Sequence, residues 1–186
     1  MSNTIYLIVE DETDVDVVRA ILKAKQIDIY VSKLIPTGKT GGVSRLASQL
    51  ERLIKTALEK RKSNDCIAVL HDADENVQTD RKSYEEIKEI CKRYSVDVVL
   101  IVAHDEIEAW LLADEGLCKW LGEKPHNCDE ETQPSLRLNR AVKKKTGKDY
   151  TGKMRNQVLE KINGTGDNSP SMRLALTHLD NAVCIR

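Results

Sequence analysis

The sequence predicts an α/β protein with a parallel sheet of about four strands, flanked by helices and followed by a helical C-terminal extension. Short apolar segments alternate with amphipathic helical segments as far as residue 103, which is the order expected of a parallel sheet. The chain has 186 residues and 40% of them are hydrophobic, enough to bury one core. We expect an α/β domain at residues 1–118 and a basic, mainly helical extension, packed on it, at 119–186.

The first two strands are predicted at residues 5–9 and 27–35, where apolar and β-branched side chains gather. Between them, apolar residues recur at helical spacing up to about Lys25. Thr13 is the predicted N-cap of this helix, with Asp16 three residues later as a short capping box.

A glycine-rich loop, PTGKTGG, covers residues 36–42 and precedes a long amphipathic helix that includes Leu46 and Leu58. It is not a P-loop, because that motif needs a glycine where this chain has Lys33. A flexible turn is the favoured interpretation. Phosphate binding by the N–H groups at the start of the helix is the alternative.

The third strand, Cys66–Leu70, is apolar throughout, as is typical of a strand buried on both faces. Asp72 and Asp74 follow at once, and side chains two residues apart in an extended segment point the same way. A helix from about Arg81 to Tyr94 then leads to the fourth strand at residues 96–103.

The chain after the fourth strand is predicted to form helices with breaks. A helix is expected to start within residues 104–112, and three more are predicted at 135–145, 153–162 and 171–179. A short apolar piece at 182–185 closes the chain.

Composition and charge restrict the functional class. No apolar run approaches the roughly 18 residues of a membrane-spanning helix, and the N-terminus lacks the features of a signal peptide. The five cysteines show neither zinc-site spacing nor a disulfide framework, so we expect a reduced, cytoplasmic environment. Residues 1–118 carry a net charge of −6 and residues 119–186 a net charge of +5, which suits a metal-dependent enzyme that acts on a polyanion.

Acidic side chains follow three of the four predicted strands. The carboxyl ends of parallel strands meet at one edge of the sheet, where ligands bind in such folds. Neighbouring carboxylates repel one another unless a cation lies between them, and Mg²⁺ prefers oxygen ligands. The candidate metal ligands are Glu10, Asp14, Asp72, Asp74, Glu106 and Glu108.

These acids, in this order, resemble the motifs of a TOPRIM domain, the catalytic module of topoisomerases, primases and nucleases of the overcoming-lysogenization-defect (OLD) family. The first motif, Glu-Gly-x-x-Asp, is matched by Glu10 and Asp14, but Asp11 replaces the glycine. Aspartate tolerates positive φ better than most residues, so we expect the turn to persist. The second motif, Asp-x-Asp, is matched by Asp72 and Asp74. The stretch HDEIEAWLLAD at 104–114 is similar to small TOPRIM-like proteins found beside ATPases in bacterial anti-phage defence systems.

The resemblance implies an enzyme that makes or breaks phosphodiester bonds with Mg²⁺ or Mn²⁺. It implies that Glu10 is a metal ligand or the general acid/base, and that Asp14 is a ligand or holds one in place. Asp72 and Asp74 would hold the metal, and Glu106 or Glu108 would complete the site. We favour Glu106, because it comes earlier on the predicted helix. The chain is short for a topoisomerase or primase, so we expect a nuclease.

The basic extension is the candidate nucleic-acid surface, because lysine and arginine bind backbone phosphates. Lys153 is the predicted cation that reaches the active site. The predicted phosphate-binding residues are Arg137, Arg140, Lys143, Lys144, Lys145, Lys148 and Arg155. A solvated helix face is the alternative.

Two other functions remain open. The segment LIVEDE resembles the start of a response-regulator receiver domain, which would accept phosphate at Asp72, but Asp74 has no role in that scheme. The other alternative is a catalytically idle or partner-activated subunit of an ATPase complex. A homodimer is also possible, and the sequence does not distinguish DNA from RNA as the substrate.

Overall fold

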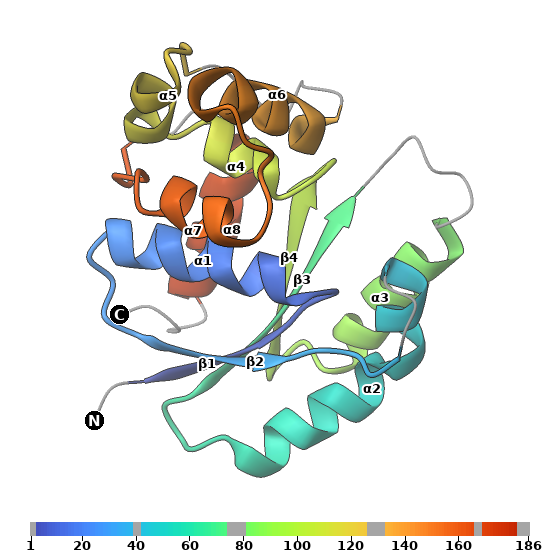
Figure 1. The fold of residues 1–186 in the computed structure, drawn as a ribbon. Coiled ribbons are helices and arrows are strands. Elements are labelled where there is room, and N and C mark those ends of the chain that lie inside the picture. Colours follow the sequence, from blue (N-terminus) through green and yellow to red (C-terminus); the bar gives the residue numbers. More distant parts are fainter. Residues whose placement is uncertain (1–2, 39–41, 74–80, 126–132, 166–168, 182–186) are drawn as a thin grey trace.

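A computed structural model describes residues 3–38, 42–73, 81–125, 133–165 and 169–181. The predicted α/β fold is confirmed. Four parallel strands form one sheet in the order β2-β1-β3-β4, which gives a Rossmann-like arrangement (Figure 1). The strands are β1 (Thr4–Ile8), β2 (Tyr30–Leu34), β3 (Cys66–Ala73) and β4 (Val98–His104).

Helices cover both faces of the sheet. Figure 1 shows α2 and α3 on one face and α1, α7 and α8 on the other, while α4 and α6 lie beyond the carboxyl end of β4. Within the described ranges there are eight helices: α1 (Glu12–Ala24), α2 (Val43–Lys60), α3 (Arg81–Arg93), α4 (Glu108–Leu112), α5 (Glu115–Leu121), α6 (Pro134–Thr146), α7 (Gly152–Leu159) and α8 (Pro170–Asn181).

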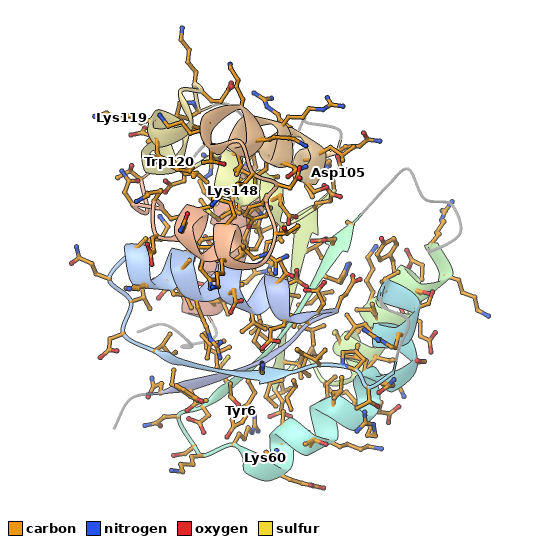
Figure 2. All side chains as sticks on the ribbon, viewed as in Figure 1. Tyr6, Lys60, Asp105, Lys119, Trp120 and Lys148 are labelled. Carbon is orange, nitrogen blue, oxygen red and sulfur yellow. The ribbon has the colours of Figure 1, made fainter. Side chains whose placement is uncertain are left out.

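The central strand β3 is buried on both faces, as its apolar sequence predicts. Ala68 and Leu70 belong to the core shared with α1, whereas Ile67 and Val69 belong to the core shared with α2 and α3. At the edge of the second core, the Tyr6 hydroxyl donates a 3.0 Å hydrogen bond to the carbonyl of Lys60, which ties β1 to the end of α2 (Figure 2).

The C-terminal extension shares the first of these cores. Apolar side chains of α6, α7 and α8, including Leu138, Val158 and Met172, pack in one cluster with those of the sheet and α1. The domain boundary predicted between residues 118 and 119 lies inside α5.

Asp114 joins the two parts of the chain. Its carboxylate accepts hydrogen bonds from the N–H groups of Leu117 (2.8 Å) and Gly164 (2.9 Å). It also accepts from the N–H of Asn163, at 3.2 Å. The carbonyl of Gly164 in turn accepts a 3.0 Å hydrogen bond from the ammonium group of Lys25 at the end of α1. The end of α1, the start of α5 and the segment after α7 therefore meet at one point.

The prediction of Thr13 as a helix N-cap was wrong. Asp11 is the N-cap of α1, and its carboxylate accepts a 2.6 Å hydrogen bond from the N–H of Thr13. Asp14 completes a capping box with Asp11. Asp11 has φ −145°, an extended conformation. The position therefore requires no positive φ, and tolerance of positive φ is not what allows an aspartate there.

Other boundaries also differ from the predictions. The second strand is shorter, because Gln26 turns the chain at φ 58° and pairing with β1 begins only at Tyr30. The helix expected to start within residues 104–112 does so, at Glu108, after Asp105 with φ 54° has interrupted the backbone that follows β4. The apolar piece at 182–185 lies outside the described residues.

The cysteines depart from expectation. We predicted no disulfide, but Cys66 at the start of β3 is disulfide-bonded. Cys91 and Cys118, the other two cysteines in the described part of the chain, are free and buried. As for the membrane, none of the described helices is both long enough and apolar enough to span a bilayer.

Candidate active site: a partly buried carboxylate cluster

The sheet order brings predicted site residues together at one edge. The chain leaves β1 for β2 on one side and returns to β3 on the other, so a switch point, where ligands bind in α/β sheets, lies between β1 and β3. Glu10 follows β1, and Asp72 is the second-last residue of β3. Asp14 lies in the first turn of α1, and Glu108 is the first residue of α4. All four side chains are half-buried.

These four carboxyl groups influence one another through their charges. Burial raises the pKa of Asp72 well above its ordinary value, and the charges of Asp14, Glu108 and Glu10 raise it further. Burial also raises the pKa of Asp14 to about 8, with added repulsion from Asp11, Glu10 and Glu108. The site therefore resists carrying several negative charges at once, so a bound proton or cation is favoured there.

The pKa of Glu108 is raised for the same reasons. Burial raises its pKa to about 7, and repulsion from Glu106 and Asp11 adds to the effect. The charge of Arg155 opposes this rise. A carboxyl group with a pKa near neutrality changes its charge readily when a cation or a proton arrives.

Backbone contacts fix the geometry of the turn that carries Glu108. The Asp72 carboxylate accepts a 2.9 Å hydrogen bond from the N–H of Ile107. The N–H of Asp105 donates to the carbonyl of Ala73 at 3.1 Å, and Asp105 itself lies at the carboxyl end of β4 (Figure 2). Residues with positive φ that are not glycine concentrate at functional sites, where the surroundings hold them.

Glu106 has a different task from the one we favoured in the sequence. Its two carboxylate oxygens accept hydrogen bonds from the N–H and the hydroxyl of Ser135, at 2.6 and 2.9 Å. Ser135 lies in the first turn of α6, where N–H groups lack helical partners and an acidic group is favourable. Glu106 thus anchors α6, and we now prefer Glu108 as the residue of this pair that faces the cluster.

Arg45 is a residue at the site that the sequence analysis missed. It lies in the first turn of α2, and its guanidinium donates to the carbonyl of Gly38 at 2.8 Å and to the carbonyl of Glu10 at 3.4 Å. The glycine-rich loop is thereby connected to the end of β1. No motif marks this arginine, because only the fold brings it near Glu10.

On the extension, a cation other than the predicted Lys153 interacts with the cluster. Lys153 is exposed on α7, whereas Arg155 is half-buried and interacts with Glu108. The guanidinium carbon of Arg155 lies 5.7 Å from the centre of the Tyr150 ring. Arg155 was predicted as a phosphate-binding residue, but nothing in the sequence marks it as a neighbour of Tyr150 or Glu108.

The other predicted phosphate-binding residues lie on or near α6. Lys143 forms an ion pair with Asp149 at 3.1 Å, and Lys144 lies 3.9 Å from Glu123. The first pair is solvent-exposed on both sides and the second has an exposed lysine, so both are weak. Arg137 is half-buried, and the exposed members of the set are Arg140, Lys143, Lys144, Lys145 and Lys148.

The cluster matches a divalent cation in its chemistry but not in its arrangement. Carboxylate oxygens from Glu10, Asp14, Asp72 and Glu108 are the ligands that Mg²⁺ and Mn²⁺ prefer. Within the described ranges, however, no three His, Cys, Asp or Glu side chains are arranged to hold a metal ion. Asp74, the other predicted ligand, lies outside the described residues. Binding would require these side chains to turn toward one another.

Comparison with known proteins identifies the family. The model of DUF3226, described as a protein of unknown function, matches residues 4–114, which is more than half of the chain. The chain belongs to the DUF3226 family. The DUF3226 match contains β1 to β4 and the four clustered carboxylates, and it ends at Asp114. No curated protein matches the chain. No solved structure matches it either.

Proposed function

We propose that this DUF3226 protein is a nuclease that hydrolyses phosphodiester bonds in DNA or RNA with the help of Mg²⁺ or Mn²⁺. The observation that carries the proposal is the cluster of four mutually repelling, half-buried carboxyl groups at the switch point of the sheet. Such a cluster lowers the stability of the fold. Carboxyl groups with perturbed pKa values gather at functional sites, where such a cost is accepted. Its resemblance to TOPRIM motifs and the basic α6 support a nucleic acid as the substrate.

Each residue has a role in this proposal. Asp72, held by the Ile107 N–H, and Glu10 are the principal candidates to hold the cation, with Asp74 as a further ligand. A bound Mg²⁺ or Mn²⁺ would neutralise charge on the phosphate oxygens and make water a stronger nucleophile. Before a cation binds, burial raises the pKa of Asp14 to about 8 and that of Glu108 to about 7, so these two are the candidates to exchange a proton near neutral pH. Arg45 holds the Glu10 backbone in place.

The test is cleavage of supercoiled plasmid and of labelled RNA in the presence of Mg²⁺ or Mn²⁺. We expect the wild type to cut at least one polymer and the Asp72→Asn variant to cut neither. Asp28→Asn is the matched control, because Asp28 is exposed and precedes β2, away from the cluster. Equal cleavage by the wild type and Asp72→Asn would refute the assignment of the site.

One observation favours a second candidate function. Since no three acidic or histidine side chains in the described part of the chain are arranged to hold an ion, a partner could be needed to draw them together. We propose, as the alternative, a subunit that a separate ATPase activates. Copurification with an ATPase and cleavage only by the complex would support this function, whereas cleavage by the purified chain alone would exclude it.

Two further proposals concern the setting of the protein. We place it in the cytoplasm, where its substrate would be, and the disulfide at Cys66 opposes this, because disulfides are rare there. Thiol titration of the protein denatured directly from cells decides: all five cysteines react in a reducing compartment. We also propose a homodimer, which sedimentation equilibrium tests.

A further inference from the structure

Tyr150 carries a buried hydroxyl group whose position needs an explanation. The side chain is only 7% exposed, and its hydroxyl has no hydrogen-bond partner among the described residues. The residue is held in place, because its N–H donates a 2.6 Å hydrogen bond to the side-chain carbonyl of Asn139 on α6. A buried hydroxyl without a partner destabilises a fold, so such groups usually serve a ligand or a water molecule.

Arg155 presents a second such group beside the first. Its guanidinium carbon lies 5.7 Å from the centre of the Tyr150 ring, within the range of a cation–π contact. The Nε of Arg155 is buried, and it too has no partner in the described ranges. Two donors, a phenol O–H and a guanidinium N–H, therefore lie buried and without a partner in the described ranges, on side chains that contact each other.

Both side chains lie close enough to Glu108 to interact with its charge. Arg155 interacts with Glu108, one of the four clustered carboxyl groups. Burial raises the pKa of Tyr150, and the charges of Glu108 and Asp16 raise it further. The phenol therefore remains protonated, and a hydrogen bond that it donates would stabilise it. The contact between α1 and α7 keeps this part of the extension against the sheet domain.

We propose that Tyr150 and Arg155 together bind a non-bridging oxygen of a phosphate group at the edge of the carboxylate cluster. A phosphate suits the pair because an arginine and a neutral donor supply one positive charge and directed hydrogen bonds. It also suits the position, because the carboxylates alone would repel an anion and Arg155 offsets the charge of Glu108. This inference rests on the proposed function, since it names the residues that orient the phosphodiester in that same site.

The test measures binding of inorganic phosphate in the presence of Mg²⁺ by isothermal titration calorimetry. We expect Tyr150→Phe to weaken binding by about tenfold, the usual effect of losing one hydrogen bond to a charged group. Arg155→Gln should weaken it by at least as much. Tyr30→Phe and Arg93→Gln are the matched controls, because Tyr30 is 62% exposed on β2 and Arg93 lies at the end of α3.

The Arg155→Lys variant separates loss of binding from misfolding, because lysine keeps the positive charge but lacks Nε. It should bind phosphate more weakly than the wild type while it gives the same circular dichroism spectrum and melting temperature. Unchanged phosphate affinity in Tyr150→Phe and Arg155→Lys would overturn the proposal and leave Arg155 as a structural partner of Glu108. Failure of the wild type to bind millimolar phosphate would overturn it as well.

The plasmid and RNA assays separate this inference from the proposed function. If the wild type cleaves neither polymer but loses phosphate binding in both variants, the nuclease proposal fails and the phosphate site stands. If the wild type cleaves and both variants bind phosphate and cleave as well as it does, the nuclease proposal stands and the phosphate site fails.

Discussion

The carboxylate of Asp72 accepts a 2.9 Å hydrogen bond from the backbone N–H of Ile107. This bond connects the end of β3 to the residue that precedes Glu108, so it sets the distance between two members of the carboxylate cluster. An acidic side chain in this position has two separable properties: its negative charge and its ability to accept the bond.

Asp72→Asn and Asp72→Ala separate these properties. Asparagine can accept the Ile107 bond without the charge, so we expect cleavage to fall by about 10² or more while stability at pH 7 is kept or raised. Alanine also removes the acceptor, so Asp72→Ala should melt at a lower temperature than Asp72→Asn. Thermal denaturation and plasmid cleavage measure the two effects. A lower melting temperature for Asp72→Asn than for Asp72→Ala would contradict the role of the bond.

Glu106 and Glu108 should respond differently to the same change. Glu108→Gln removes a charge from the cluster and should abolish cleavage without a loss of melting temperature. Glu106→Gln weakens the two bonds to Ser135 and should destabilise the fold by about 1 kcal/mol, as for loss of a helix cap. Its cleavage, corrected for the folded fraction, should be retained. The reverse pattern in melting and cleavage assays would restore Glu106 as the catalytic member of the pair.

Stability should fall as pH rises from 5 to 8. The pKa of Asp14 is about 8 in the folded protein against 3.8 ordinarily, so the folded state binds more protons than the unfolded state in this range. Denaturant unfolding at pH 5 and pH 8 measures the difference. Asp14→Asn should reduce it by about 1.4 kcal/mol or more, the equivalent of one pKa unit. Asp28→Asn should leave it unchanged, and a pH-independent stability in the wild type would disprove the coupling.

Gly164→Ala should destabilise the protein because of a close approach. A Cβ at Gly164 would lie 2.8 Å from the backbone of Ala24. Gly147 is the matched control, because its φ of 74° nearly equals the 73° of Gly164 but a Cβ there would meet no atom within 4 Å. We expect Gly164→Ala to lower the unfolding free energy by about 1–3 kcal/mol more than Gly147→Ala does. Equal effects in denaturant unfolding would show that the backbone around Ala24 and Gly164 accommodates the added Cβ at little cost.

The basic face of α6 predicts a salt dependence. Replacing Lys143, Lys144 and Lys145 by glutamine should reduce the slope of log K against log salt by about 1–2 for duplex DNA, since each phosphate contact contributes about 0.9. We expect less than three full contacts because Lys143 and Lys144 already have acidic neighbours. Glutamine at the exposed residues Lys60, Lys62 and Lys92 is the control. An unchanged slope in the α6 variant would exclude this face as a phosphate-binding surface.

The sheet was predictable because burial of whole strands leaves an apolar signal. β3 is buried on both sides along Cys66–Leu70, and an apolar run this short is too brief for a buried helix. Parallel pairing then implies that Glu10 and Asp72 meet at one edge. Strand and helix ends were less predictable, because Asp11 and Thr13 are both good caps and only the hydrogen bonds decide between them.

Long-range contacts explain what could not be predicted at the site. Glu106 and Glu108 look alike in the sequence, and the choice between them depends on Ser135, which lies 29 residues further along. Arg45 belongs to no motif and reaches Glu10 across 35 residues. The backbone of Asp105 is in a left-handed conformation that its neighbours in sequence do not signal.

Asp114 is the last residue of the DUF3226 match, and its carboxylate is held by N–H groups of residues 117, 163 and 164. The part of this chain that matches the family model therefore ends at a carboxylate whose hydrogen-bond donors all come from later residues. A fragment that stops at Asp114 would keep the acidic edge but lose the hydrogen bonds to Asp114 and the side chains that the extension contributes to one core. We therefore expect the two parts of the chain to melt as one cooperative unit, and a fragment of residues 1–114 to be less stable than the whole chain.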